Sequence, residues 1–252
     1  MVLKRALPVT AILACCISGC ANLGQAPLWP RIQSASVAAV KQKSVWVPLA
    51  SAAVIGVVDA DDSISDWAVE HTPVFGSASA AEDAANQMVE SLMVSALVST
   101  LVSESDHGDR FKSMAVNGLS LVVNQKVTRG VKGLVKRKRP TRLSDQSFPS
   151  LHTSRAFAAA EITARNLARI SLHHKTKDYL QAGVYTLASA TAWARLEERA
   201  HYPTDVLVGA ALGSFIVGVF NEAFLREESS ATLSFQPVRD GAAVSLHWQP
   251  YR

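Results

Sequence analysis

The stretch RAHYPTDVLVG, residues 199–209, places a histidine and a carboxylate at the start of a long apolar segment. His201 precedes Asp205 by four residues, and apolar residues then dominate from Val206 to Phe220. Pro203 suits the first turn of a helix, and an aspartate there interacts favourably with the positive end of the helix dipole. Helix chemistry alone can therefore explain the pair, and a functional role needs support from the rest of the chain.

Apolar periodicity of the helical type recurs along the chain and predicts an all-α bundle of about six helices. The expected helices cover 45–58, 80–104, a segment from about 109, a segment from about 150, 176–197 and 203–225. The tail alternates apolar and polar residues around Asp240-Gly241, which is typical of a β-hairpin. We therefore expect a helical domain over 45–228 and a small C-terminal β-hairpin within 229–252.

The first twenty residues, MVLKRALPVTAILACCISGC, have a basic start, a short apolar core and small residues, as a secretory signal does. Their end, Ile17-Ser18-Gly19-Cys20, resembles the lipobox of bacterial lipoproteins. The resemblance implies a signal peptide over 1–19, palmitate-type lipidation of Cys20 and a tether over 20–44. Because Ala21 follows the cysteine, it also implies a periplasm-facing protein of the cell envelope, at the outer membrane rather than the inner one.

The uninterrupted apolar runs are roughly 13 to 16 residues long, shorter than the ~20 residues that a membrane-spanning helix needs. Hydrophobic residues make up 48% of the chain, and the mean hydropathy is +0.14. These values favour a water-soluble bundle that a lipid anchor attaches to a membrane. A bundle partly embedded in the bilayer is the alternative.

Positive charge is concentrated in one segment. The chain has a formal net charge of +4, and seven Lys and Arg residues with no acidic residue lie between Arg129 and Arg142. Since the basic character is local, the composition does not predict a nucleic-acid-binding protein.

Three motifs follow one another in the helical part of the chain. The first is KGLVKRKRP, with Lys132 and Arg139 seven residues apart, and the second is FPSLHTSRAF, with Ser150 and His152. The third is ARLEERAHYPTD, which contains Arg195, His201 and Asp205. Each motif is weak alone, but together and in this order they are specific.

The ordered motifs resemble those of the type 2 phosphatidic acid phosphatase (PAP2) superfamily, which also contains bacterial acid phosphatases and vanadium haloperoxidases. The family pattern is K-x6-RP, then PSGH, then SR-x5-H-x3-D. The sequence departs from it at Leu151, where Gly is usual, and at Ala194, where Ser is usual. The resemblance covers about residues 45–225 and implies a helical phosphatase domain.

The residue types also fit phosphate chemistry directly. A helix that starts at Ser150 points the backbone amides of Leu151, His152 and Thr153 outward, which makes an anion site. Lys and Arg side chains add positive charge, and Arg can bind phosphate through two nitrogens. We expect the phosphate-binding set to be Lys132, Arg139, Ser150, Leu151, His152 and Arg195. No cluster with metal-ligand spacing appears, so we expect neither a metal nor another cofactor.

Two histidines remain for the chemical steps. Asp205 can hold one ring nitrogen of His201 and leave the other as an oriented nucleophile. The resemblance implies that His201 forms a phosphohistidine, and that His152 protonates the leaving oxygen and then activates water. The other histidines (His71, His107, His173, His174 and His247), as well as Arg155 and Arg199, are better explained as surface or structural residues.

The sequence thus predicts a metal-independent phosphatase that hydrolyses a phosphate monoester or diphosphate, either lipid-linked or a small periplasmic molecule. Two alternatives stay open. One is a vanadate-dependent haloperoxidase, since the same cradle binds vanadate, and the other is a non-catalytic phosphate-binding lipoprotein of the envelope. The oligomeric state is not indicated by the sequence.

Overall fold

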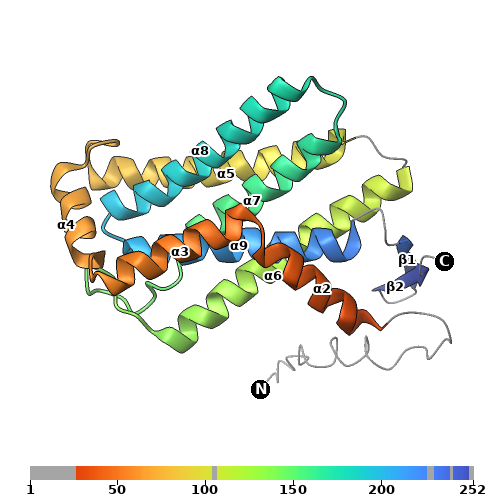
Figure 1. Cartoon of the computed structure of the whole chain (residues 1–252), viewed down its shortest axis with the longest axis horizontal. Coiled ribbons are helices and arrows are strands. Elements are labelled where there is room, and N and C mark those ends of the chain that lie inside the picture. The colour runs from red at the N-terminus through yellow and green to blue at the C-terminus, as the bar shows by residue number, and fades with distance from the viewer. Residues whose placement is uncertain (1–26, 104–106, 226–229, 239–240, 250–252) are drawn as a thin grey trace, which may run out of the picture.

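The computed structural model describes residues 27–103, 107–225, 230–238 and 241–249. The predicted signal peptide and the lipidation site Cys20 lie outside these residues. The described helices and strands (Figure 1) are α2 (Leu28–Val40), α3 (Lys43–Val57), α4 (Asp61–His71), α5 (Ala78–Val102), α6 (His107–Val135), α7 (Leu151–Arg169), α8 (His174–Glu197), α9 (Pro203–Phe224), β1 (Ser230–Val238) and β2 (Gly241–Gln249).

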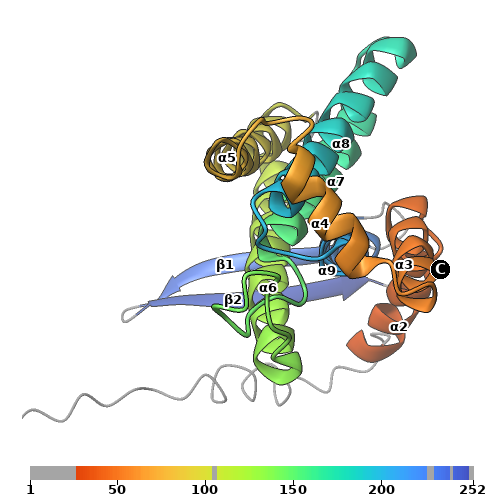
Figure 2. The same ribbon diagram turned by 90° about the vertical axis from the view of Figure 1, so that its left-hand side faces the viewer.

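Helices α7 and α9 form the centre of the bundle. Helix α7 packs against α5, α6, α8 and α9, and the view along the bundle shows these helices around it (Figure 2). The inner face of α7 is made of small residues, and Ala156, Ala158, Ala159 and Ala160 are fully buried. Small side chains allow the neighbouring helix backbones to come close, so the position of α7 is set from several sides.

Two glycines bring α9 into direct backbone contact with α7. A Cβ atom at Gly209 would lie 2.7 Å from the carbonyl oxygen of Ser150, and one at Gly213 would lie 2.2 Å from that of Ser154. Any side chain at either position would push the helices apart. The segment GAALG (209–213) is therefore a G-x-x-x-G packing motif that holds the start of α7 against α9.

Buried hydrogen bonds fasten α6 to the same part of α7. The hydroxyl of Ser154 donates to Asn124 Oδ1 (2.7 Å), and Asn124 Nδ2 donates to the carbonyl oxygen of Ser154 (3.2 Å). Thr128 is 3.2 Å from the Ser154 hydroxyl. Since Lys132 follows Thr128 by one helical turn, this network places Lys132 beside the first turn of α7.

The helix count differs from the expected six, because the described residues contain eight helices. Helix α2 lies inside the expected tether over 20–44, and its Ala35 and Ala39 are buried. The prolines that suggested a linker stand before and within its first turn, where helices accept them. Helix α4 begins inside the acidic stretch 59–66 because acidic residues favour a helix N-terminus.

Beyond α9, strands β1 and β2 pair antiparallel, from Ser230 opposite Gln249 to Val238 opposite Gly241. The expected turn residue Asp240 lies outside the described residues. The predicted site is formed by the helices and by the segments that join α6 to α7 and α8 to α9.

The expectation that no helix is long enough to span a membrane is wrong. Helix α5 (25 residues, mean hydropathy 1.2) and helix α9 (22 residues, mean hydropathy 1.7) meet the length and composition of a span. Helices α3 and α4, which meet at an angle of 100°, would qualify as a third span if counted together. The length of uninterrupted apolar runs underestimates the length of such helices, because α5 contains polar residues among its apolar ones, which a span tolerates.

Candidate active site

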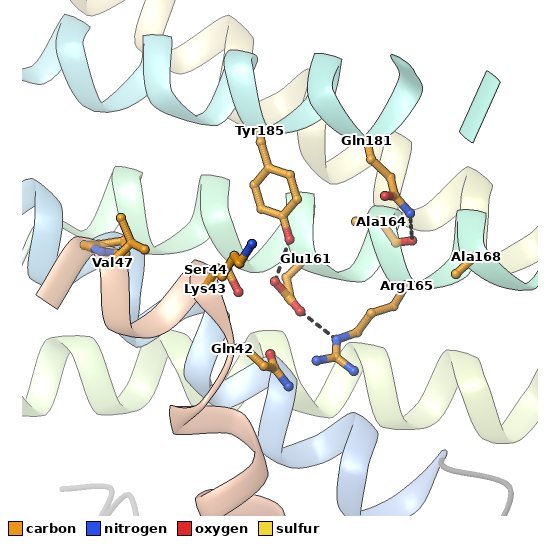
Figure 3. Close-up of a pocket in the computed structure, with 11 residues that line it drawn as sticks. Gln42, Lys43, Ser44, Val47, Glu161, Ala164, Arg165, Ala168, Gln181 and Tyr185 are labelled. Carbon is orange, nitrogen blue, oxygen red and sulfur yellow. Dashed lines mark hydrogen bonds and ion pairs between the residues drawn. The ribbon is translucent and has the colours of Figure 1, made fainter. Parts of the chain in front are cut away.

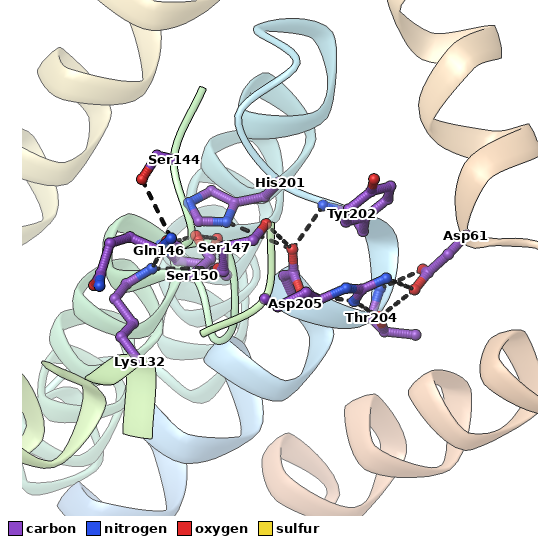
Figure 4. A network of polar contacts seen from close by, with 12 residues as sticks. Asp61, Lys132, Ser144, Gln146, Ser147, Ser150, His201, Tyr202, Thr204 and Asp205 are labelled. Atoms are coloured by element: carbon purple, nitrogen blue, oxygen red, sulfur yellow. Dashed lines mark hydrogen bonds and ion pairs between the residues drawn. The ribbon is translucent and has the colours of Figure 1, made fainter. Parts of the chain in front are cut away.

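The three motifs meet at one end of the bundle, where α6 and α8 end and α7 and α9 begin (Figure 4). Ser150 is completely buried there, and its backbone N–H donates to the carbonyl oxygen of Asp205 (2.9 Å). Ser150 is also the N-cap of α7, since its hydroxyl accepts from the backbone N–H of Thr153. The expected helix start, with its outward-pointing amides, is thus joined directly to the third motif.

His201 and Asp205 face each other in the buried interior of this end. His201 Nδ1 lies 3.7 Å from Asp205 Oδ2, and their side chains are 2% and 0% exposed. The separation exceeds a hydrogen bond, and Nδ1 has no hydrogen-bond partner among the described residues. Burial lowers the pKa of His201 from 6.5 to about 4, although Asp205 opposes this shift. The imidazole is therefore neutral at physiological pH, as a nucleophile must be.

The carboxylate of Asp205 is held by three other donors. Arg137 Nη1 donates to Oδ1 (2.8 Å), while the Ser147 hydroxyl (2.5 Å) and the backbone N–H of Tyr202 (2.9 Å) donate to Oδ2. The contact with Tyr202 is the reach-back of a capping box, in which the third residue of the helix satisfies the N-cap amide. Asp205 therefore caps α9 and faces His201 with the same oxygen.

Arg137 continues this network to a distant part of the chain. Its Nη2 donates to Asp61 Oδ2 (2.8 Å) and its Nη1 to the Thr204 hydroxyl (2.8 Å). Asp61 also accepts from the backbone N–H of Thr204 (2.9 Å). The sequence did not reveal these residues: Arg137 is a spacer inside the first motif, and Asp61 lies far from any motif.

Lys132 is buried and holds the loop before α7. Its Nζ donates to the carbonyl oxygens of Gln146 (2.5 Å) and Ser147 (3.2 Å). Burial, followed by the charge of Arg139, lowers the pKa of Lys132 from 10.5 to about 8. Lys132 thus carries charge at neutral pH and fixes the segment that supplies Ser147.

The two arginines of the predicted phosphate-binding set each have a donor without an acceptor. Nε of Arg139 and Nε of Arg195 are buried and have no hydrogen-bond partner among the described residues. Arg195 is only 4% exposed, and it forms an ion pair with Glu198. Buried donors without acceptors are costly, and the Nε atoms of Arg139 and Arg195 are two such donors in the predicted site. An anion bound between these groups would satisfy such donors.

His152 lies at the edge of the site against α5. Its Nε2 is 3.0 Å from Asn86 Oδ1, a contact that the sequence did not reveal. Burial, and then the charges of Arg195 and His201, lower the pKa of His152 from 6.5 to about 3. A bound phosphate would counter those charges and raise the pKa again, which an acid to the leaving oxygen requires.

The two departures from the family pattern have different surroundings. Ala194 is fully buried in an apolar cluster with Ala81 and Ala85 of α5. Its methyl group therefore packs against α5 next to Arg195. A serine at this position would bury its hydroxyl in this apolar contact. Leu151 is half-buried at the first position of α7.

A large cavity elsewhere in the bundle is separate from this site. It has a volume of about 700 Å³ and lies between the start of α3, α7 and α8 (Figure 3). Arg165 Nε and the Tyr185 hydroxyl both donate to Glu161 inside it (2.7 Å each). Glu161 follows Ser150 by three helical turns, and none of the predicted site residues lines this cavity.

Comparisons with known proteins agree with the motifs. A family model described as the PAP2 superfamily matches residues 113–228. A segment of 80 residues is 38% identical to the lipid A 1-phosphatase of Porphyromonas gingivalis, covering 32% of this chain and 17% of that relative. The chain therefore matches less than a fifth of the length of that curated relative.

A solved structure shows the same fold. The transmembrane PAP2-type phosphatidylglycerolphosphate phosphatase from Bacillus subtilis superimposes with a TM-score of 0.53 at 19% sequence identity. The superposition covers 77% of this chain and 92% of that protein. Residues 113–228, which contain every predicted catalytic and phosphate-binding side chain, thus form a domain of the PAP2 superfamily.

Proposed function

We propose that this protein is a phosphatase that hydrolyses a phosphate ester through a phosphohistidine on His201. The observation that carries the proposal is the pair of buried, unpartnered guanidinium donors, Arg139 Nε and Arg195 Nε, in the site that also holds the start of α7 and the buried imidazole of His201. Positive charge, outward amides and an oriented imidazole are the groups that phosphoryl transfer uses.

In the first step, His201 Nε2 attacks phosphorus, because its Nδ1 faces Asp205. The N–P bond forms, the bond from phosphorus to the leaving oxygen breaks, and His152 gives its proton to that oxygen. Asp205 stabilises the positive charge that develops on the His201 ring. Lys132, Arg139 and Arg195 balance the charge of the transferring phosphoryl group.

In the second step, His152 removes a proton from water, and the water oxygen attacks phosphorus. The N–P bond breaks, inorganic phosphate leaves, and both histidines return to their starting forms. All proton transfers use these protein groups, so the proposed cycle needs no metal or other cofactor.

We further propose a phosphorylated lipid as the substrate. Both relatives are named as phosphatases of phosphorylated lipids. Helices α5 and α9 have the length and composition of membrane spans, which would bring the site to a lipid surface. A monoester and a diphosphate both remain candidate groups for the cradle.

The decisive experiment measures phosphate release from phosphorylated lipids by the purified protein, with His201→Ala as the matched variant. We expect release by the wild type, no release by the variant, inhibition by vanadate and no loss of activity with chelators. Halide oxidation in the presence of vanadate would instead identify a haloperoxidase. Phosphate binding without turnover would identify a non-catalytic binding protein.

For localisation, we propose a cell-envelope protein anchored through lipid on Cys20 as well as through its helices. Labelling with a radioactive fatty acid tests the anchor directly. We expect Cys20→Ala to lose the label and to accumulate as the uncleaved precursor. Equal labelling of wild type and variant would contradict the lipoprotein assignment.

A further inference from the structure

One chain of contacts connects α4 to the catalytic pair. Asp61, at the first position of α4, contacts Arg137, and Arg137 contacts Asp205, each at 2.8 Å. Asp61 also holds the first turn of α9, because Thr204 donates to it through its backbone N–H (2.9 Å) and its hydroxyl (2.5 Å). The ring of Tyr202 lies 4.2 Å from the Arg137 guanidinium carbon and covers it from one side.

These contacts fix the orientation of the Asp205 carboxylate relative to His201. The guanidinium occupies Oδ1, so the carboxylate cannot rotate without losing an ion pair, and Oδ2 remains toward the imidazole (Figure 4). The side chain of Asp205 is 0% exposed and that of Asp61 is 14% exposed. Arg137 is 31% exposed, so water reaches the guanidinium but not the carboxylate of Asp205, whose charge therefore acts strongly on its neighbours.

We propose that Arg137 and Asp61 are positioning residues of the active site. They fix the orientation of Asp205, and the positive charge of Arg137 weakens the electrostatic effect of the Asp205 carboxylate on His201. The inference rests on the proposed phosphohistidine chemistry. It also gives α4 a role: the helix pair α3–α4, bent by 100°, is fastened through Asp61 to the turn that carries the nucleophile.

The sign of the electrostatic effect follows from the surrounding charges. The titratable and charged groups that influence the pKa of His201 include Lys132 of α6, Arg195 of α8, His152 of α7 and Asp205 of α9. Removing Arg137 takes away a cation and leaves Asp205 with its full charge. Both changes favour the imidazolium, so the pKa of His201 should rise.

The test compares Arg137→Met, Arg137→Lys and Asp61→Asn with Lys138→Met, which removes a cation from the exposed neighbouring position. For Arg137→Met we expect kcat to fall about 10- to 100-fold with KM changed much less, because the group acts through Asp205. The acid limb of the kcat/KM profile should move up by about one pH unit. Lys138→Met should leave kcat and the profile unchanged.

Arg137→Lys restores the charge but not the two-pronged geometry. It should return the acid limb to the wild-type position while recovering only part of kcat. Asp61→Asn should lower kcat in the wild-type background and have little further effect in Arg137→Met, since it acts through Arg137. A purely structural contact would lower stability in these variants without moving the pH profile.

A measurement without turnover separates this inference from the proposed function. The His201 ring can be titrated by NMR in protein labelled with ¹⁵N-histidine, and its pKa should be about one unit higher in Arg137→Met. If the wild type releases no phosphate from any substrate, the proposed function fails, and this titration then decides the coupling alone. The inference is overturned if Arg137→Met has the wild-type kcat and the pKa of its His201 is unchanged. If Arg137→Met does not fold, the same two measurements on Arg137→Lys and Asp61→Asn decide the question.

Discussion

Arg137 binds Asp205 at 2.8 Å through the carboxylate oxygen that is turned away from His201. A fully buried carboxylate is stable only if donors satisfy it, and Asp205 receives donors on both oxygens. The oxygen facing His201 is shared with the Ser147 hydroxyl and the Tyr202 amide. Asp205 therefore has two roles, since it completes the N-terminal cap of α9 and faces the proposed nucleophile His201.

Asp205→Asn should be far more damaging than its small change in size suggests. Both oxygens of Asp205 accept from donors, so the new amide NH₂ must face a donor in either orientation. We expect kcat to fall between about 100- and 10,000-fold and stability to fall by about 1–3 kcal/mol. Steady-state kinetics measure kcat, and thermal unfolding in detergent measures stability. The control is Asp62→Asn, the same exchange at an exposed aspartate next to Asp61. Near-normal turnover in Asp205→Asn would remove Asp205 from the mechanism.

His152→Ala should show a loss that depends on the leaving group. General acid catalysis contributes about 10²- to 10⁴-fold when the leaving oxygen is a strong base, and much less when it is a weak one. We therefore expect a large loss with an alkyl phosphate and less than about a tenfold loss with nitrophenyl phosphate. Equal losses with the two substrates would show that His152 does not donate the proton.

The low pKa of His201 predicts how stability depends on pH. Its pKa is about 4 in the folded protein, against an ordinary value of 6.5 that applies to the unfolded chain. Between these values the unfolded chain binds the extra proton, so stability is complete above about pH 6.5 and falls as the pH drops toward 4. His201 alone should contribute a slope of up to about 1.4 kcal/mol per pH unit, and His152, with a pKa of about 3, adds a similar contribution over the same range.

Thermal unfolding across this range checks the prediction. Vanadate should flatten the slope, because a bound anion raises the pKa of the folded imidazole. His201→Asn should remove about half of the slope, because His152 still binds its proton only in the unfolded chain over this range. If both leave the slope as it is in the wild type, the acid sensitivity comes from other groups.

The residues of the candidate site were predicted from three short motifs, and the structure brings these motifs to one end of the bundle. Ser150 was expected as the start of a helix and is the N-cap of α7. Asn86 and Asp61 were missed, since they reach the site only through the packing of α5 and α4. Such contacts between distant segments leave no local pattern in the chain.

The fold was predicted best where apolar periodicity is long. The expected segments 203–225 and 176–197 agree with α9 (Pro203–Phe224) and α8 (His174–Glu197) within two residues. Helix α2 was missed because its prolines were interpreted as a linker, although burial of Ala35 and Ala39 stabilises it as a helix. The G-x-x-x-G segment of α9 was a local signal of close helix packing that was available in the sequence.

Gly209→Ala should disturb the site through the backbone. The added methyl group would lie 2.7 Å from the Ser150 carbonyl oxygen, so the first turn of α7 must move away from α9. We expect a loss of about 1–3 kcal/mol in stability and a marked rise in the Kd for vanadate. Gly118→Ala is the control, because its added methyl group would meet no atom of another helix within 4 Å. Unchanged vanadate binding in Gly209→Ala would show that this contact does not set the anion site.

The exposed apolar face of α5 tests whether the bundle is embedded in a membrane. Val98 is 50% exposed in the second half of this candidate span. If lipid surrounds it, Val98→Arg places a charge in the bilayer one helical turn before the end of α5, at a cost below the ~2.5–3.5 kcal/mol of a position at the centre of a span. We then expect reduced insertion and rapid degradation of the variant. If water surrounds the helix, the same substitution should be tolerated or should improve solubility.

Leu143→Arg, at a position that is 90% exposed in the loop before α7, controls for the added charge and should accumulate normally. Accumulation of Val98→Arg to wild-type amounts would therefore show that α5 does not cross the membrane.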